Sequence, residues 1–217
     1  TGAFVANPWV GRFNGLTRGF SHQAALWEIS RSRRSFAVLR LIGRFWQAET
    51  GKGAPELMRR ALSWWDQASG EPTFVFLNLM EAHSPFDQVP GAARYGVENP
   101  RLVGERTNLA QMGGPEPIDY PNPGEVEAAR RLQAAGIRYL DDQIGELVET
   151  LRARGLLEHT VLAVTSDHGE AFGEHGFHGH MVGLYEETLH VPLVLHYPPA
   201  IAAGTVINDP VPLQMLH

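Results

Sequence analysis

Residues 165–180, TSDHGEAFGEHGFHGH, hold four histidines and three carboxylates but almost no side chain that could fill a core. Asp167 and His168 come directly after the apolar run VLAVTS. On a turn, adjacent carboxylate and imidazole groups can both reach one divalent cation. Two protein ligands do not complete such a site. The segment therefore indicates a place where the chain supplies part of a cation site.

The other histidines of this segment have plainer interpretations. His175-x-x-His178-x-His180 is loosely compatible with a zinc-sequestering tract, because imidazole is a common metal ligand. For Glu170 and Glu174, a role as a capping or solvated acid is as well supported by the sequence as a role at the site. Histidines elsewhere are expected to be solvated or hydrogen-bonded, as single loop histidines usually are: His22, His159, His190, His196 and His217.

His83 follows a second apolar run. The run PTFVFLNLM, residues 72–80, is rich in β-formers and predicts a strand buried on both faces of a parallel sheet. In open α/β sheets, ligand sites lie beyond the carboxyl ends of the strands. We therefore expect His83 to face the same crevice as the Asp167–His168 pair.

The remaining elements complete an alternating order. Residues 1–21 predict loops with one short strand at 3–6, and PELMRRALSWWDQA at 55–68 predicts an amphipathic helix. The strongest helix signal has Asn122 as N-cap, Pro123 at the first position, Glu125 placed to reach back, and Gly155 as the stop. Its apolar face is marked by Leu132, Gly136, Leu140, Ile144, Leu147 and Leu151.

Two further apolar runs, residues 159–166 and 191–198, predict buried strands. The order of strands and helices predicts an α/β fold with a mostly parallel sheet flanked by helices. At 217 residues, one compact unit is expected. Within it, we expect an irregular segment at 1–54 and an α/β core at 55–217, interrupted by a long Gly- and Pro-rich loop at 87–121.

Composition excludes several classes of function. A net charge of -6 argues against a general nucleic-acid binder, and the basic run RSRRSFAVLR at 31–40 is interpreted as a solvated helix face, with a local anion-facing patch as the alternative. The absence of cysteine excludes disulfides, thiolate metal sites and a cysteine nucleophile within the chain. No stretch approaches the roughly 18 apolar residues of a membrane span. The composition leaves the cellular compartment unassigned.

The run TVLAVTSDHGEAFGEHGFHGHMVGLYEETLHVPLVLHYP closely resembles the C-terminal half of the sulfatase catalytic domain, in the alkaline phosphatase superfamily. The segments FVFLNLMEAHSPF, RYLDDQIGELVETLRARGLLEHT and TGAFVANPWVGRFNGLTRGF also resemble parts of that domain. The terminal DPVPLQMLH resembles the start of a later family segment. The resemblance spans nearly the whole chain and implies an alkaline-phosphatase-like fold.

The resemblance also implies roles for four residues. Asp167 and His168 would be ligands of a divalent metal, with calcium first and manganese or zinc as alternatives. His83 would contact the sulfate or phosphate oxygens or the leaving group. His180 lies where many relatives place a lysine, so it would be the second contact to the ester anion. A histidine there can change its protonation within the physiological range, whereas a lysine is a fixed charge.

Two family features are missing from the sequence: the early Asp-Asp metal pair and the Cys/Ser-x-Pro-x-Arg nucleophile loop, whose cysteine or serine becomes formylglycine. We therefore expect a catalytic domain truncated at its N-terminal side, with the nucleophile and any formylglycine outside this chain. Such a chain would be inactive by itself, and its unpaired sheet edge would invite self-association.

The predicted function is that of a sulfuric ester hydrolase acting on a small-molecule or glycan sulfate ester. One alternative is a phosphodiesterase or phosphonate monoester hydrolase of the same superfamily, acting on a phosphate or phosphonate ester. A second is a catalytically inactive fragment that binds a metal or an anion. No nucleic-acid partner and no membrane span are expected.

Overall fold

The computed structural model describes residues 1–11, 14–26, 51–68, 70–86, 89–97, 100–104, 122–181 and 183–216. Four features predicted from the sequence lie wholly or partly outside these ranges. They are the irregular segment at 1–54, the basic run at 31–40, much of the loop at 87–121, and His217.

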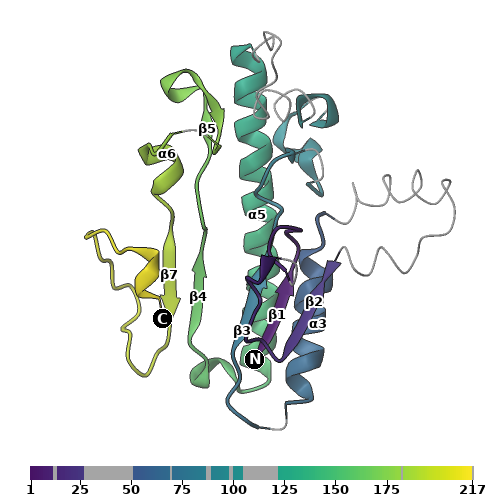
Figure 1. The fold of residues 1–217 in the computed structure, drawn as a ribbon, viewed down its shortest axis with the longest axis vertical. Helices are drawn as coiled ribbons and strands as arrows, with labels where there is room; N and C mark the ends of the chain where they lie inside the picture. The colour runs from purple at the N-terminus through teal and green to yellow at the C-terminus, as the bar shows by residue number, and fades with distance from the viewer. Residues whose placement is uncertain are drawn as a thin grey trace, which may run out of the picture.

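A small parallel sheet lies near the N-terminus of the chain (Figure 1). Its strand order is β2 (His22–Ala25), β1 (Gly2–Val5), β3 (Val75–Asn78), and both pairings are parallel. β1 is central and buried throughout. The predicted strand at 3–6 thus exists, one residue earlier. β2 was not predicted, because HQAA carries no apolar run and forms a strand only by pairing with β1.

β3 differs from its prediction in burial. The run at 72–80 was expected to be buried on both faces, but Phe76 within β3 is 37% exposed and Phe74 just before it is 59% exposed. Among the described residues, β3 is hydrogen-bonded to β1 alone and is therefore an edge strand. An apolar run does not by itself distinguish a central strand from an edge strand.

β4 (Leu162–Thr165) and β7 (Leu193–His196) form a separate antiparallel pair. The prediction of fully buried strands in a parallel arrangement is wrong for this pair, since the pairing is antiparallel, Val194 of β7 is 60% exposed and Val161 just before β4 is 65% exposed. The residues between them form a hairpin of β5 (Ala171–Phe172) and β6 (His178–Gly179) and the short helix α6 (Glu186–Leu189). Without a long crossover helix, the chain returns in the opposite direction.

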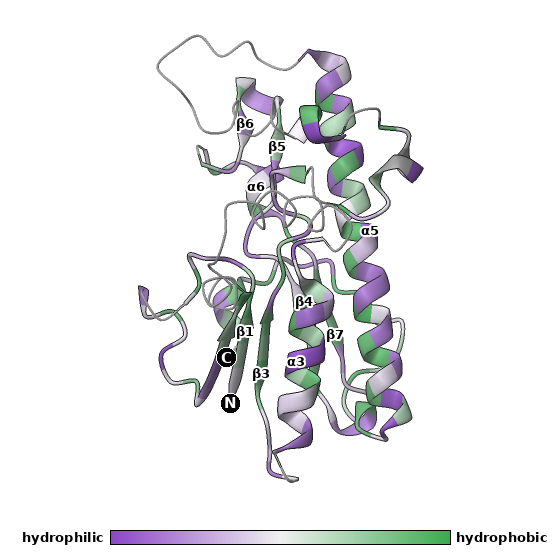
Figure 2. Ribbon diagram, turned by 90° about the vertical axis from the view of Figure 1, so that its right-hand side faces the viewer, coloured by the Kyte–Doolittle hydropathy of each residue, from purple (hydrophilic) through white to green (hydrophobic). Residues whose placement is uncertain are grey.

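Helices α3 and α5 lie on the same side of the sheet strands β1 and β3, as Figure 2 shows. α3 (Ala54–Asp66) buries Leu57 and Ala61 against Phe4 of β1. α5 (Pro123–Ala153) begins with the predicted capping box, in which Asn122 and Glu125 each accept the other's backbone N–H at 3.0 Å. The α/β class, with a small parallel sheet and helices, is confirmed.

The half of α5 nearer its start covers a second core. Its side chains Ala129, Leu132 and Ala135 pack with Phe86 and Val89, which follow β3. The described residues also contain short 3-10 helices: η3 (Ala92–Tyr95), η4 (Leu157–His159), η5 (Glu174–Gly176) and η6 (Leu213–Met215). Within the same residues, no helix combines the length and the apolar character needed to cross a membrane.

The loop between β3 and His83 is held by both helices. The carboxylate of Glu81 is fully buried and accepts the N–H of Ala54, the first residue of α3, at 2.8 Å. Gly53, the N-cap of α3, has no side chain that could do this. On the other side, a Cβ at Gly136 of α5 would lie 2.4 Å from the carbonyl oxygen of Glu81. A glycine at 136 thus lets α5 pack directly on this loop.

The packing at Gly136 predicts opposite effects for the same substitution at two points on α5. We expect Gly136→Ala to lower the free energy of unfolding by about 1–3 kcal/mol, the usual cost of overpacking. Gly145→Ala is the matched control, because a Cβ there would meet nothing within 4 Å. Alanine's higher helix propensity should raise stability there by up to about 1 kcal/mol. Urea unfolding measures both; equal effects would contradict the packing argument.

Candidate active site

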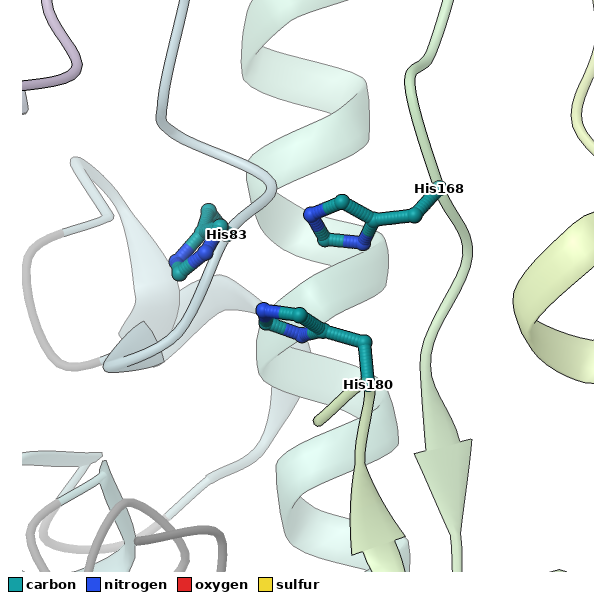
Figure 3. Close-up of side chains that lie close together, drawn as sticks. All are labelled: His83, His168 and His180. Atoms are coloured by element: carbon teal, nitrogen blue, oxygen red, sulfur yellow. The ribbon is translucent and has the colours of Figure 1, made fainter. Parts of the chain in front are cut away.

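Three histidines from three segments meet at one place (Figure 3). His83 follows β3, His168 follows β4, and His180 follows β6. The ring centroids of His168 and His180 are 3.9 Å apart, and the His83 ring is 5.7 Å and 5.0 Å from them. One nitrogen of each ring lies within 4.8 Å of the other two. The expectation that His83 and His168 face one crevice agrees with this geometry.

Each of the three rings is oriented by a hydrogen bond at its Nδ1 atom. Nδ1 of His83 lies 2.5 Å from the carbonyl oxygen of Ser84, and Nδ1 of His168 lies 2.8 Å from that of Gly169. Nδ1 of His180 lies 3.0 Å from a carboxylate oxygen of Glu170. Carbonyl and ionised carboxylate oxygens only accept, so each Nδ1 donates its proton. The Nε2 atoms are therefore the groups that can act on a ligand.

Backbone packing fixes the loop that carries His168. A Cβ at Gly169 would lie 2.1 Å from the carbonyl oxygen of Glu187 in α6. The N–H of Gly169 donates to the carbonyl oxygen of Thr188 at 2.9 Å. The chain of α6 thus runs directly against the residue after His168. The pairing of Gly179 with Ala171 in the β5–β6 hairpin then brings His180 over the His168 ring.

Asp167 lies beside the histidine cluster rather than in it. Its side chain is 75% exposed, and its Oδ1 atom is 3.8 Å from Nε2 of His168. A cation at about 2.0–2.4 Å from each donor atom can be held by two donors at this separation. The donor set of one carboxylate and one imidazole therefore fits a divalent metal, and the exposed carboxylate leaves room for further ligands.

The other residues of the opening segment lie apart from the cluster. His175 stacks on Tyr185 at 3.9 Å between ring centroids. His178 lines a cavity of about 490 Å³ beside Arg130, whose guanidinium pairs with Glu174. In the part of the chain that the structure describes, the histidines that share a potential metal site are His83, His168 and His180. The tract His175-x-x-His178-x-His180 is not assembled as one ligand set.

Two acidic residues contribute more to the site than the sequence indicated. Glu170, for which the sequence left the interpretation as a capping or solvated acid open, has a side chain just 3% exposed and orients His180. Glu81 was not singled out, yet it holds the loop that leads to His83. A carboxylate two residues from a candidate histidine is the signal that could have found both.

Burial and charge separate the pKa values of two of the histidines. The hydrogen bond to the Glu170 carboxylate, with that group's negative charge, raises the pKa of His180 above its ordinary value of 6.5. Burial is the main cause that lowers the pKa of His83 below 6.5, and the charges of Lys52 and His180 add to it. His180 is therefore the ring that holds a second proton more readily.

The chain is similar to several curated proteins. It is 35% identical to human iduronate 2-sulfatase (Homo sapiens) over 91 residues, which cover 42% of this chain and 16% of that protein. It is 39% identical to the choline-sulfatase of Rhizobium meliloti over 79 residues, which cover 36% of this chain and 15% of that protein. The chain thus matches only a small part of each of these relatives.

Solved structures share the fold. The phosphonate monoester hydrolase of Agrobacterium radiobacter matches with a TM-score of 0.62 and 18% identity, covering 91% of this chain and 50% of that one. The phosphonate monoester hydrolase SpPMH from Silicibacter pomeroyi matches with a TM-score of 0.58 and 16% identity, with the same coverage. The chain therefore spans half the length of both solved hydrolases.

The family model that matches this chain is that of the sulfatases, and the match runs over residues 18–214. It includes all three histidines of the cluster and the Asp167–His168 pair. The chain belongs to the sulfatase family of hydrolases, within the alkaline phosphatase superfamily.

Proposed function

We propose that this chain supplies the cation and anion contacts of a sulfate ester hydrolase. The observation that supports this most directly is the convergence of His83, His168 and His180 beyond the ends of strands, with Asp167 beside them. Family membership supports the reaction class. The nucleophile, which the family resemblance assigns to a formylglycine, would come from outside this chain.

In this proposal, Asp167 and His168 hold the divalent metal. Calcium is the metal that the family resemblance favours, with manganese or zinc as alternatives. When bound, the metal would stabilise negative charge on the ester oxygens. The exposed carboxylate of Asp167 offers oxygen, while His168 offers the Nε2 atom that its bond to Gly169 leaves free.

His180 is proposed to contact the non-bridging oxygens of the ester. Its bond to Glu170 favours the doubly protonated ring, whose Nε2–H can donate to an oxyanion. His83 is proposed to face the leaving group. A bound anion would counter the effect of burial on the His83 pKa and favour its protonation, so that Nε2–H could protonate the departing alcohol.

A second candidate reaction is hydrolysis of a phosphodiester or phosphonate monoester. The tetrahedral anions of both ester classes carry oxygens that the same imidazoles could contact. The multifunctional alkaline phosphatase superfamily protein PehA of Trinickia caryophylli is 27% identical to this chain over 158 residues, which cover 63% of this chain and 30% of that protein. Comparing kcat/KM for an aryl sulfate, an aryl phosphonate monoester and an aryl phosphodiester would separate the candidates. A preference for either phosphorus ester would overturn the sulfatase assignment.

Substitutions at the cluster should lower hydrolysis of an aryl sulfate by a full-length enzyme that contains these residues. We expect Asp167→Asn to reduce kcat/KM at least about 100-fold through loss of the metal, and His83→Ala or His180→Ala to reduce kcat about 10²–10³-fold. His180→Lys should keep most of the activity, because it retains a positive donor. His159→Ala, exposed at the other end of β4, is the control. Normal turnover by Asp167→Asn would remove the metal assignment.

The two pKa shifts predict opposite pH dependences. NMR titration of the metal-free chain should show His180 titrating above 6.5 and His83 below it. Because the folded pKa of His180 is raised, its stabilising contribution is present below about pH 6.5 and is lost as the pH rises through the folded pKa. The lowered pKa of His83 makes its charging costly as the pH falls below 6.5.

Glu170→Gln tests the cause of the His180 shift. The variant should return the His180 pKa toward 6.5 or below, because it removes the carboxylate that raises it. Its loss of unfolding free energy should be larger below about pH 6.5, where the raised pKa stabilises the folded chain, than at a pH above the folded pKa of His180. An unchanged His180 titration in Glu170→Gln would contradict the assigned cause.

A further inference from the structure

We propose that His175 is a positioning residue for the candidate active site, acting through Tyr185 and Glu187 of the following segment. Together they hold the strand that leads to His180 at a fixed place beside the loop that carries His168. The three positioning residues lie outside the histidine cluster. Their contacts stand on geometry alone, whereas their consequence for catalysis rests on the proposed function.

The backbone at His175 is the first observation. This residue lies in η5, the turn of the β5–β6 hairpin, with φ 57° and ψ 17°. Among the described residues it is the one residue other than glycine that has a positive φ. Glycine adopts this left-handed conformation without strain, whereas a residue with a Cβ does not. The turn alone would therefore favour glycine at 175, and the strained conformation points to a role for the imidazole.

The imidazole of His175 stacks on the residue that begins α6. Its ring centroid lies 3.9 Å from that of Tyr185, the N-cap of α6, and the two planes differ by 10°. Phe177 of the same hairpin packs on the Tyr185 ring at 5.6 Å. Gly183 leaves the room for this packing, because a Cβ there would lie 2.8 Å from both the Phe177 and the Tyr185 rings. Three rings thus join the hairpin to α6.

A buried carboxylate oxygen also lies near the His175 ring. Nε2 of His175 is 3.4 Å from Oε2 of Glu187. That oxygen is buried and accepts no hydrogen bond from the described residues. A buried carboxylate oxygen is costly unless a donor or a positive charge lies beside it. With a proton on Nε2, His175 supplies this donor after a movement of about 0.5 Å. The contact therefore gives the ring a second partner in α6.

The short helix α6 carries these contacts on to the loop of His168. A Cβ at Gly169 would lie 2.1 Å from the carbonyl oxygen of Glu187, and the N–H of Gly169 donates to the carbonyl oxygen of Thr188 at 2.9 Å. The buried hydroxyl of Thr188 donates to the carbonyl oxygen of Tyr185 at 3.0 Å. The segment that holds the His175 ring therefore also holds the residue after His168.

The hairpin carries the same contacts back to His180, which follows β6. β5 and β6 pair over two residues each, and α6 lies beside them (Figure 1 and Figure 2). So short a two-stranded ribbon is marginal by itself, so contacts at its turn must help to fix its direction. The stacking of the His168 and His180 rings at 3.9 Å reflects this direction.

This spacing matters if the enzyme works as proposed, because His168 then holds the metal and His180 contacts the ester oxygens. A misplacement of about 1 Å can lower a rate about 100-fold, even when the change lies away from the chemistry. In the proposal His175 contacts neither the metal nor the ester. Its loss should therefore act through the geometry of the other two rings.

His175→Gly tests this role in a full-length enzyme that contains these residues. Glycine accepts the φ of 57°, so the turn can persist while the ring is lost. We expect kcat for an aryl sulfate to fall about 10- to 100-fold, and Tyr185→Ala to have a similar effect. Tyr185→Phe keeps the stacked ring and should change kcat by no more than about twofold.

His190→Ala is the matched control. His190 also pairs with a glutamate, with 3.1 Å between its Nδ1 and Oε1 of Glu186, but both side chains are exposed and belong to one segment, α6 and its C-cap. Its removal leaves the contacts between the hairpin and α6 in place, so we expect kcat to stay within about twofold of the unmodified enzyme.

NMR of the metal-free protein gives a readout that does not depend on turnover. Nuclear Overhauser contacts between the His168 and His180 rings should be present in the unmodified protein and in Tyr185→Phe, and should weaken in His175→Gly and Tyr185→Ala. Far-UV circular dichroism should stay unchanged. A variant that was merely less stable would keep the ring contacts in its folded state.

Three results would overturn the inference. They are ring contacts that persist in His175→Gly, a kcat of that variant within about twofold of the unmodified enzyme, and unfolding of His175→Gly but not of His190→Ala. The last would show a general structural role. If the unmodified enzyme hydrolyses no sulfate ester but the ring contacts respond as expected, the proposed function fails and the positioning role stands.

Discussion

A side chain at position 136 or 169 would collide with a backbone carbonyl oxygen of a neighbouring segment. The contact at Gly136 brings α5 against the loop that leads from β3 to His83, and the contact at Gly169 brings α6 against the residue after His168. Both are contacts of backbone with backbone, which are stiffer than contacts between flexible side chains. Since the rings must meet within a few ångströms to act on one ligand, the cluster depends on these two close approaches.

Much of this arrangement was predictable because it is encoded locally. The start of α5 follows from Asn122, Pro123 and Glu125, which form the expected capping box. The position of His83 and His168 just beyond strands follows from the apolar runs that end before them. These signals need only a few neighbouring residues, and single-sequence reasoning reads such signals well.

The features that were missed depend on residues far apart in the chain. β2 exists because β1 pairs with it, and nothing in HQAA indicates a strand. The antiparallel direction of β7 follows from the hairpin and short helix that replace a crossover helix. The bond from Glu81 to Ala54 joins residues 27 positions apart, so no periodicity in the sequence reports it. Pairing partners and burial, unlike caps, are properties of the whole fold.

The exposed apolar side chains at β3, β4 and β7 also show that burial depends on the whole fold and not on the local sequence. Val161 and Val194 have the composition of buried strands, yet they lie on a surface of this chain. An apolar strand whose face is open is stable only where something covers it, or it associates with another copy. The chain spans half of the solved hydrolases that share its fold, and these open apolar faces belong to the half that it spans. The histidine cluster lies beyond the ends of two of these strands, so whatever covers them would also lie close to the site.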